Sequence, residues 1–186
     1  MNKIKIIALI GEAGSGKDFL LHQVQAAHPE YHTIVSVTTR PPRSNEIPGQ
    51  DYHFVDKDTF FEMCDNGDML EFTSFNGWCY GTALQSVDVE KVNIGVFNPA
   101  GVDHLLLNNN VDVQVFYVRA PERERLLRQL QRDENVDVKE VLRRFRTDLE
   151  DFSDLDFHYT NINNSSLSSV AESVARIVWA ESSNQT

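Results

Sequence analysis

A glycine-rich segment near the N-terminus has the residue types and spacing to bind phosphate. It lies between an apolar run at residues 4–10 and a helical pattern, and Gly11, Gly16 and Lys17 fit the G-x-x-x-x-G-K core of a P-loop. In such a loop, backbone N–H groups and a helix N-terminus face one concavity, and the lysine reaches the outer phosphates of a nucleoside triphosphate. We therefore expect the whole loop to bind the triphosphate: Gly11, Glu12, Ala13, Gly14, Ser15, Gly16, Lys17 and Asp18.

Asp18 stands where this motif normally has Ser or Thr, whose hydroxyl ligates Mg²⁺. A carboxylate can bind a hard cation directly, but it also brings a negative charge close to the phosphates. Two interpretations are open: Asp18 is a metal ligand, or it is a substitution that weakens the loop. We favour the metal ligand, because every other demand of the loop is met.

Basic residues are concentrated in one segment of an acidic chain. The formal net charge is −11, yet nine of the 17 Lys and Arg residues lie between residues 119 and 146. The overall charge argues against nucleic-acid and anionic-membrane partners, and the local concentration indicates an anion site. Arg128 and Arg132 are four residues apart and share a helix face. A solvated helix face paired with glutamates is the alternative for several of these arginines.

Strand-like and helical segments alternate along most of the chain and must position these residues. Strand-like runs are at residues 3–10, 33–37, 92–97, 111–118 and 159–162, and helical patterns at 17–27, 100–107, 122–132, 138–151 and 167–179. This alternation predicts an α/β fold, a parallel sheet with helices on both faces. Residues 38–85 break it with short strands at 52–55 and 69–72 and a helix at 59–66, which predicts a small inserted lobe. The polar stretch at 133–137 is typical of a mobile lid.

The composition favours a single cytoplasmic domain. At 186 residues with 41% apolar content, the chain is long enough for one full core. No apolar run approaches the ~20 residues needed to cross a bilayer, and the N-terminus reads as a first strand. Two cysteines, Cys64 and Cys79, give no disulfide framework.

From the first strand to about residue 164, the chain resembles the guanylate kinases. The resemblance is carried by S-V-T-T-R-P-P-R at 36–43, G-Q-D-Y-H-F-V at 49–55, Glu71, Y-G-T at 80–82 and the arginines Arg128, Arg132 and Arg144. It implies one domain (1–186) with a P-loop NTPase-type three-layer α/β/α core at 1–37 and 87–186. It also implies an inserted mixed α+β monophosphate-binding lobe at 38–86 and a helical lid at about 128–144.

The resemblance implies transfer of the γ-phosphoryl group of ATP to GMP or dGMP, with Mg²⁺, in a monomer or homodimer. Small-molecule nucleotides are then the partners. Lys17, Arg40, Arg43, Arg132 and Arg144 are the expected catalytic residues. Arg128 and Asn163 join the loop in binding ATP, with Asn163 on the adenine side.

The expected acceptor pocket has a phosphate end and a base end. Arg40 and Arg43 can grip a monophosphate through bidentate contacts. By resemblance, the hydroxyl groups of Ser36, Tyr52 and Tyr80 complete the phosphate end. At the base end, the carboxylate of Glu71 can accept from guanine N1–H and N2–H₂, and Thr82 can donate to O6, so the wrong base leaves a partner unpaired.

Asp18 and Asn98 depart from the family pattern and indicate a divergent member, for which a viral source is one option. The family pattern D-x-D-x-Q-G is replaced here by Val96 to Gly101, so Val96 and Asn98 stand in place of two aspartates. Asn98 can still hydrogen-bond to a bound nucleotide but supplies no charge. The lid is one residue longer than expected, so Arg143 could replace Arg144.

Two other functions compete with a guanine-specific kinase. The first is a guanylate-kinase-like binding module that has lost catalysis, although such modules usually have a damaged P-loop. The second is a kinase with a broader range of acceptors, either other (deoxy)nucleoside monophosphates or a phosphorylated sugar. Glu71 and Thr82 favour guanine, whereas Asp18 and Asn98 leave room for a changed preference.

Overall fold

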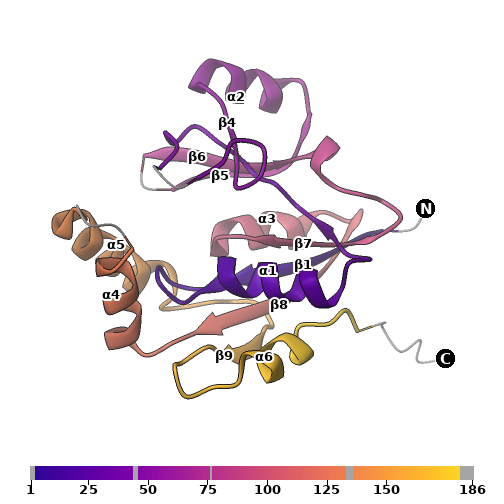
Figure 1. Cartoon of the computed structure of the whole chain (residues 1–186). Coiled ribbons are helices and arrows are strands. Elements are labelled where there is room, and N and C mark those ends of the chain that lie inside the picture. Colours follow the sequence, from indigo (N-terminus) through magenta and orange to yellow (C-terminus); the bar gives the residue numbers. More distant parts are fainter. Residues whose placement is uncertain (1–2, 44–45, 76, 133–135, 181–186) are drawn as a thin grey trace.

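The computed structural model describes residues 3–43, 46–75, 77–132 and 136–180. Its central sheet has five strands in the order β2-β7-β1-β8-β9, and every neighbouring pair is parallel. The strands are β1 (Ile4–Ile10), β2 (His32–Thr33), β7 (Val92–Val96), β8 (Val111–Arg119) and β9 (Thr160–Asn163). A parallel sheet needs crossover helices, and these cover both of its faces (Figure 1).

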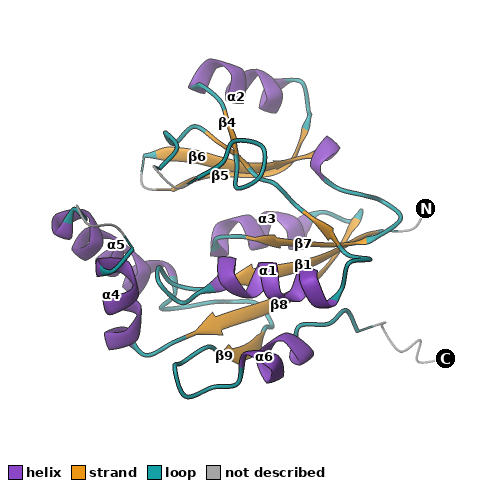
Figure 2. Cartoon of the chain, viewed as in Figure 1, coloured by secondary structure: helices purple, strands orange, loops and turns teal. Residues whose placement is uncertain are grey.

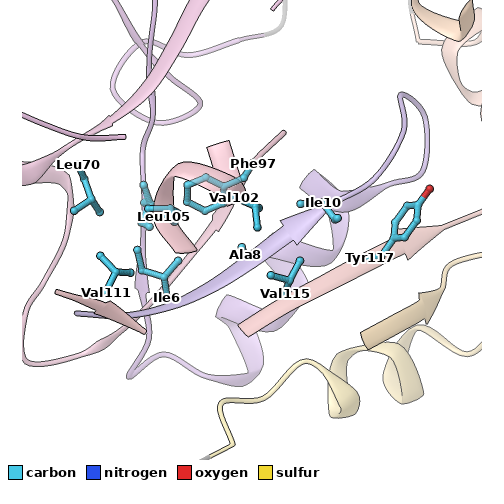
Figure 3. Close-up of a cluster of buried hydrophobic side chains, with 11 residues drawn as sticks. Ile6, Ala8, Ile10, Leu70, Phe97, Val102, Leu105, Val111, Val115 and Tyr117 are labelled. Carbon is cyan, nitrogen blue, oxygen red and sulfur yellow. The ribbon is translucent and has the colours of Figure 1, made fainter. Parts of the chain in front are cut away.

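The alternation of side chains along β1 divides the core into two halves. Ile7 and Leu9 pack with α1 (Lys17–Ala27) and with Ile177, just after α6 (Val170–Arg176). Ile6, Ala8 and Ile10 point to the opposite face and pack with α3 (Pro99–Leu107), as Figure 3 shows. Helices therefore sandwich the sheet, and the predicted three-layer α/β/α core is confirmed.

A second, mixed sheet lies apart from the central one (Figure 2). Its strand order is β4-β3-β6-β5, formed by β3 (Val37–Thr38), β4 (His53–Phe54), β5 (Met69–Phe75) and β6 (Trp78–Ala83). The helix α2 (Lys57–Asp65) buries Phe60 in this sheet's own small core with Val37, Cys79 and Ala83. The short 3₁₀ helix η1 (Leu84–Ser86) follows β6. This is the predicted small mixed lobe; the residue boundaries of the domain division stay a prediction.

One strand prediction in this region is wrong, and one strand was not predicted. The run at 33–37 is not one strand, because the chain follows β7 only as far as the bond from Ile34 N to Ile94 O and then pairs with β6 from Val37. The sequence analysis also missed β6, which pairs antiparallel with β5. Its sequence combines Trp and Tyr with Gly81, and because glycine has no side chain it interrupts the strand pattern.

The lid segment contains α4 (Glu122–Leu130) and α5 (Val138–Asp151), seen at the left of Figure 1. The predicted helix to residue 132 is too long, so Arg132 follows α4 instead of lying on it. Asp137 caps α5 by accepting bonds from the N–H groups of Lys139 and Glu140. Residues 133–135 of the predicted lid lie outside the described residues. Within the described ranges, no helix is long and apolar enough to cross a membrane.

Candidate active site

One cavity of about 410 Å³ brings the P-loop, the second sheet and the lid helices together. Most of the predicted site residues line it: Gly11, Ala13, Gly14, Gly16, Lys17, Asp18, Ser36, Arg40, Arg43, Tyr52, Glu71, Tyr80, Asn98, Arg128, Arg132 and Arg144. Four do not: Glu12, Ser15, Thr82 and Asn163. Their roles and those of the lining residues remain predictions.

The P-loop adopts a backbone that only glycine fits at three positions, of which Gly11 is the first and would place a Cβ against the carbonyl oxygen of Val118. Gly14 and Gly16 have φ values of +79° and +90°. A Cβ on Gly14 would lie 2.5 Å from the carbonyl oxygen of Arg125, and one on Gly16 would collide with the side chain of Asn164. The helix α1 begins directly after Gly16, so its first N–H groups face the cavity that the loop borders.

Residues far along the chain hold the P-loop carbonyl groups. Arg128 donates from Nη1 to the carbonyls of Gly14 (3.3 Å) and Ser15 (3.2 Å), and from Nη2 to that of Asn164 (2.8 Å). Asn164 in turn donates from Nδ2 to the Ser15 carbonyl at 2.7 Å. Arg128 is therefore bound to the loop backbone at the rim of the cavity.

Asn164 was missed by the sequence analysis, which chose its neighbour Asn163. Asn163 is exposed and does not line the cavity, and its side chain accepts from Ser165 N at 3.1 Å. The alternation of β9 was the available signal. Ile162 faces the core, so the residue two positions later, Asn164, lies on the same buried side.

Glu12 and Ala13 are also held from the lid side. Glu12 Oε1 lies 3.0 Å from Nη1 of Arg125, which is 2% exposed and stacks over the ring of Phe145 at 4.7 Å. The N–H of Ala13 donates to Oδ2 of Asp148 at 2.9 Å, and its carbonyl accepts from Gln129 at 3.3 Å. The side chain of Glu12 thus anchors the loop and lies outside the cavity.

The two acceptor arginines are joined by Glu46, which the sequence analysis missed. Oε1 of Glu46 accepts from Arg40 Nη2 (2.8 Å) and Arg43 Nη1 (3.2 Å), and Oε2 accepts from the Arg43 N–H (2.8 Å). Burial opposes ionisation of Glu46, but its bonds from Arg40 and Arg43 outweigh this and lower its pKa. An acidic residue three positions after Arg43 was the signal in the sequence.

The charges of two further arginines, Arg132 and Arg144, act on Arg43 of this pair. Burial lowers the pKa of Arg43, and the charges of Arg40, Arg144 and Arg132 lower it further. Arg40 also lies over the ring of Tyr52, 5.4 Å from its centre. An anion such as a phosphate group is the natural counter-charge for such a cluster.

Asp18 faces the same region from α1. The pKa of the Tyr52 phenol is raised by burial, and next by the negative charge of Asp18. Within the described residues, no group of three or more His, Cys, Asp or Glu side chains could hold a metal ion. Asp18 lines the cavity, and its role as metal ligand stays a prediction.

The base end of the cavity contains a buried carboxylate. Glu71 is 7% exposed, and burial raises its pKa to about 7, although interactions with Thr82 oppose the shift. Thr82 is opposite Glu71 in the β5–β6 pairing. Asn98 caps α3 by accepting from Gly101 N at 2.7 Å, and it donates to Thr73 of the second sheet at 2.8 Å. Thr73 is a further lining residue that was not predicted.

Glu140 holds the two lid arginines that the sequence left as alternatives. It accepts two bonds of 2.7 Å from Arg143 and one of 2.8 Å from Nε of Arg144. These bonds, led by those from Arg143, lower the pKa of Glu140 to about 2. Both arginines line the cavity, and Arg143 is the more exposed, at 43% against 28% for Arg144.

The sequence is similar to guanylate kinases over nearly its whole length. The sequence model of the guanylate kinase family matches residues 3–181. A guanylate kinase of Gloeobacter violaceus is 31% identical over 182 residues, which cover 95% of this chain and 88% of that protein. One of Chlamydia felis is 31% identical over 165 residues, covering 86% and 80%. In fold, the crystal structure of guanylate kinase from Anaplasma phagocytophilum has a TM-score of 0.66 at 22% identity and covers 95% of this chain and 84% of that one.

Proposed function

This chain belongs to the guanylate kinase family, enzymes that phosphorylate GMP with ATP, and from that premise we propose how its cleft carries out the transfer. One observation carries the proposal: the P-loop and the two arginines that Glu46 joins, Arg40 and Arg43, border the same cavity. ATP would lie on the P-loop, GMP on the second sheet, and the γ-phosphoryl group would pass between them.

On the acceptor side, Arg40 and Arg43 bind the GMP phosphate. Glu46 fixes both guanidinium groups in advance, so little side-chain ordering is required on binding. Hydroxyl groups of Ser36, Tyr52 and Tyr80 supply further donors at this end. Glu71 accepts from the guanine N1–H and N2–H₂ groups, which adenine lacks, with Thr82 and Asn98 beside it.

On the donor side, Lys17 and the backbone N–H groups of residues 11–18 bind the ATP phosphates, except those of Ala13 and Ser15, which are bonded within the protein. Arg128 and Asn163 lie at the nucleoside end. Lys17, Arg132 and Arg144 neutralise charge that develops on the transferring group, which is the main requirement of phosphoryl transfer.

Mg²⁺ is part of the proposal. Proteins usually hold this ion with one or two carboxylates together with substrate phosphates, and Asp18 offers one carboxylate at the phosphate end of the cavity. When bound there, the ion would reduce the negative charge of the phosphates. We further propose dGMP as an acceptor, a monomer or homodimer, and a cytoplasmic location.

A coupled assay of ADP formation with ATP and Mg²⁺ tests the acceptor assignment. GMP, dGMP, AMP, dTMP, dCMP and UMP are offered in turn, with Lys17→Ala as the blank. We expect turnover with GMP and dGMP alone, and its loss in Glu71→Gln, whose amide cannot accept two guanine donors. Glu90→Gln, at an exposed position, is the matched control. Turnover on several bases would point to the broader kinase, and GMP binding without turnover would point to the binding module.

A further inference from the structure

We propose that Asp148 is a positioning residue for phosphoryl transfer. Its bond to the P-loop fixes α5 so that Arg144, one helical turn earlier, faces the transferring group. The inference rests on the proposed role of Arg144 and goes beyond it, because it says what sets the place of that arginine.

Asp148 is bonded directly to the P-loop. Asp148 is 5% exposed, and its Oδ2 accepts from the N–H of Ala13 at 2.9 Å, across 135 residues of sequence. The carbonyl of Ala13 accepts from Gln129 of α4 at 3.3 Å. Ala13 is thus held on both sides, once by each of the helices α4 and α5. A bond of this kind between a loop and a helix fixes their relative position, since breaking it leaves the partly buried N–H of Ala13 and the buried carboxylate of Asp148 unpaired.

Asp148 shares a face of α5 with two other residues of the cavity. Glu140, Arg144 and Asp148 follow one another at intervals of four residues, so they lie on one face of the helix. All three line the nucleotide cavity. Glu140 takes the bond from Arg144 Nε at 2.8 Å, so the two Nη groups are the ones that can reach a phosphate. Arg144 therefore lies between a carboxylate that orients its guanidinium and one that anchors its helix.

The negative charge of Asp148 does not favour ATP binding. A buried carboxylate beside the P-loop repels a triphosphate, so ATP affinity does not explain its presence. Burial raises the pKa of Asp148, while the Ala13 N–H and the charge of Lys17 oppose this. Asp148 therefore supplies a hydrogen-bond acceptor that holds α5 at a fixed distance from the P-loop. Because Arg144 lies on the same face of α5 as Asp148, this contact also favours Arg144 over Arg143 as the phosphate-facing arginine.

Three variants of Asp148 separate distance from charge. Asp148→Ala removes the acceptor, Asp148→Asn keeps an acceptor of the same length without charge, and Asp148→Glu keeps the charge on a longer side chain. Glu150→Ala is the matched control, because Glu150 is exposed on the same helix. The measurements are the single-turnover rate of phosphoryl transfer at saturating ATP and GMP, the Kd for ATP, and the Tm of each variant.

We expect Asp148→Ala to lower the rate about 30- to 100-fold, because a displacement of about 1 Å at a catalytic group can cost this much. The Kd for ATP should change less than about threefold. Asp148→Asn should keep the rate within about threefold, and Asp148→Glu should lose about tenfold. If Asp148→Ala does not fold, the Asn and Glu pair still decides, and an Asn variant slower than the Glu variant would overturn the inference.

A double-mutant cycle with Arg144→Ala tests whether Asp148 acts through Arg144. In that background, Asp148→Ala should cost less than about threefold, since the arginine that it positions is gone. Effects that multiply in full would overturn the inference while leaving the role of Arg144 intact. So would a loss of ATP affinity with an unchanged rate. If Arg144→Ala by itself leaves the rate unchanged, the proposed role of Arg144 fails first.

Discussion

The two regions of this enzyme that are proposed to bind phosphate are built in different ways. In the acceptor pocket, Arg40, Arg43 and Glu46 lie within seven residues of one another and pair directly. The P-loop, by contrast, is bonded to Arg128, Gln129, Asp148 and Asn164, all more than 110 residues away. The acceptor arginines are therefore organised by their own loop, whereas the shape of the donor loop depends on the assembled core and lid.

The largest expected effect is on the acceptor side. Arg40→Ala removes a guanidinium that is proposed to bind phosphate and leaves the buried carboxylate of Glu46 without one of its two partners at 2.8 Å. We expect kcat/KM for GMP to fall about 10³-fold, in line with the loss of a charge-stabilising group, while the Kd for ATP is unchanged. Arg123→Ala, at an exposed position, is the control. A parallel loss of ATP affinity would break the comparison, because the acceptor pocket would then also support the donor loop.

On the donor side, Asn164→Ala should weaken ATP and spare GMP. The variant leaves the buried carbonyl of Ser15 with Arg128 alone and should cost about 1–3 kcal/mol of stability. We expect KM for ATP to rise about tenfold, which corresponds to a loss of about 1.4 kcal/mol in the free energy of ATP binding. Urea unfolding and steady-state kinetics measure the two effects. Asn161→Ala, on the exposed side of β9, should change neither quantity.

The base end predicts a pH dependence with a definite sign. The carboxylate of Glu71 has a pKa of about 7, so a growing fraction is protonated as the pH falls below that value. A protonated carboxyl cannot accept both guanine donors. Affinity for GMP should therefore be greatest above pH 7 and about tenfold weaker at pH 6 than at pH 8.

The phosphate of GMP also titrates near pH 6, so a control must remove its contribution. Glu71→Gln keeps the phosphate titration and lacks the carboxylate. Binding of GMP measured against pH should lose most of its pH dependence in this variant. An equal slope in both proteins would assign the effect to the phosphate and refute the prediction for Glu71.

This difference between the two regions also explains what could be predicted from the sequence. The P-loop glycines, Arg40 and Arg43 form short motifs, and the structure places all of them at one cavity. Asp148 and Asn164 are single polar residues whose partners lie at the other end of the chain. No local pattern marks them, apart from the alternation that buries Asn164 beside Ile162. The strand β6 was missed for a related reason, since it exists through pairing with β3 and β5.

The smallest expected effect concerns Asp18. If its carboxylate ligates Mg²⁺, Asp18→Ser should raise the Mg²⁺ concentration for half-maximal activity about threefold, because the serine hydroxyl is the weaker ligand but the usual one at this position. Asp58→Ser, exposed on α2, is the control. If Asp18 only weakens the loop, Asp18→Ser should instead lower the Kd for ATP without Mg²⁺.

The same substitution sharpens the comparison when it is combined with Asn98→Asp. Asn98 lies at the start of α3 and bonds to Thr73, so it joins the core to the acceptor lobe, whereas Asp18 belongs to the donor loop. If the chain has moved one acidic group from position 98 to position 18, the double variant should be more active than the two single effects predict. Effects on kcat/KM that multiply independently would mean that the two phosphate-binding regions adjust their charge separately.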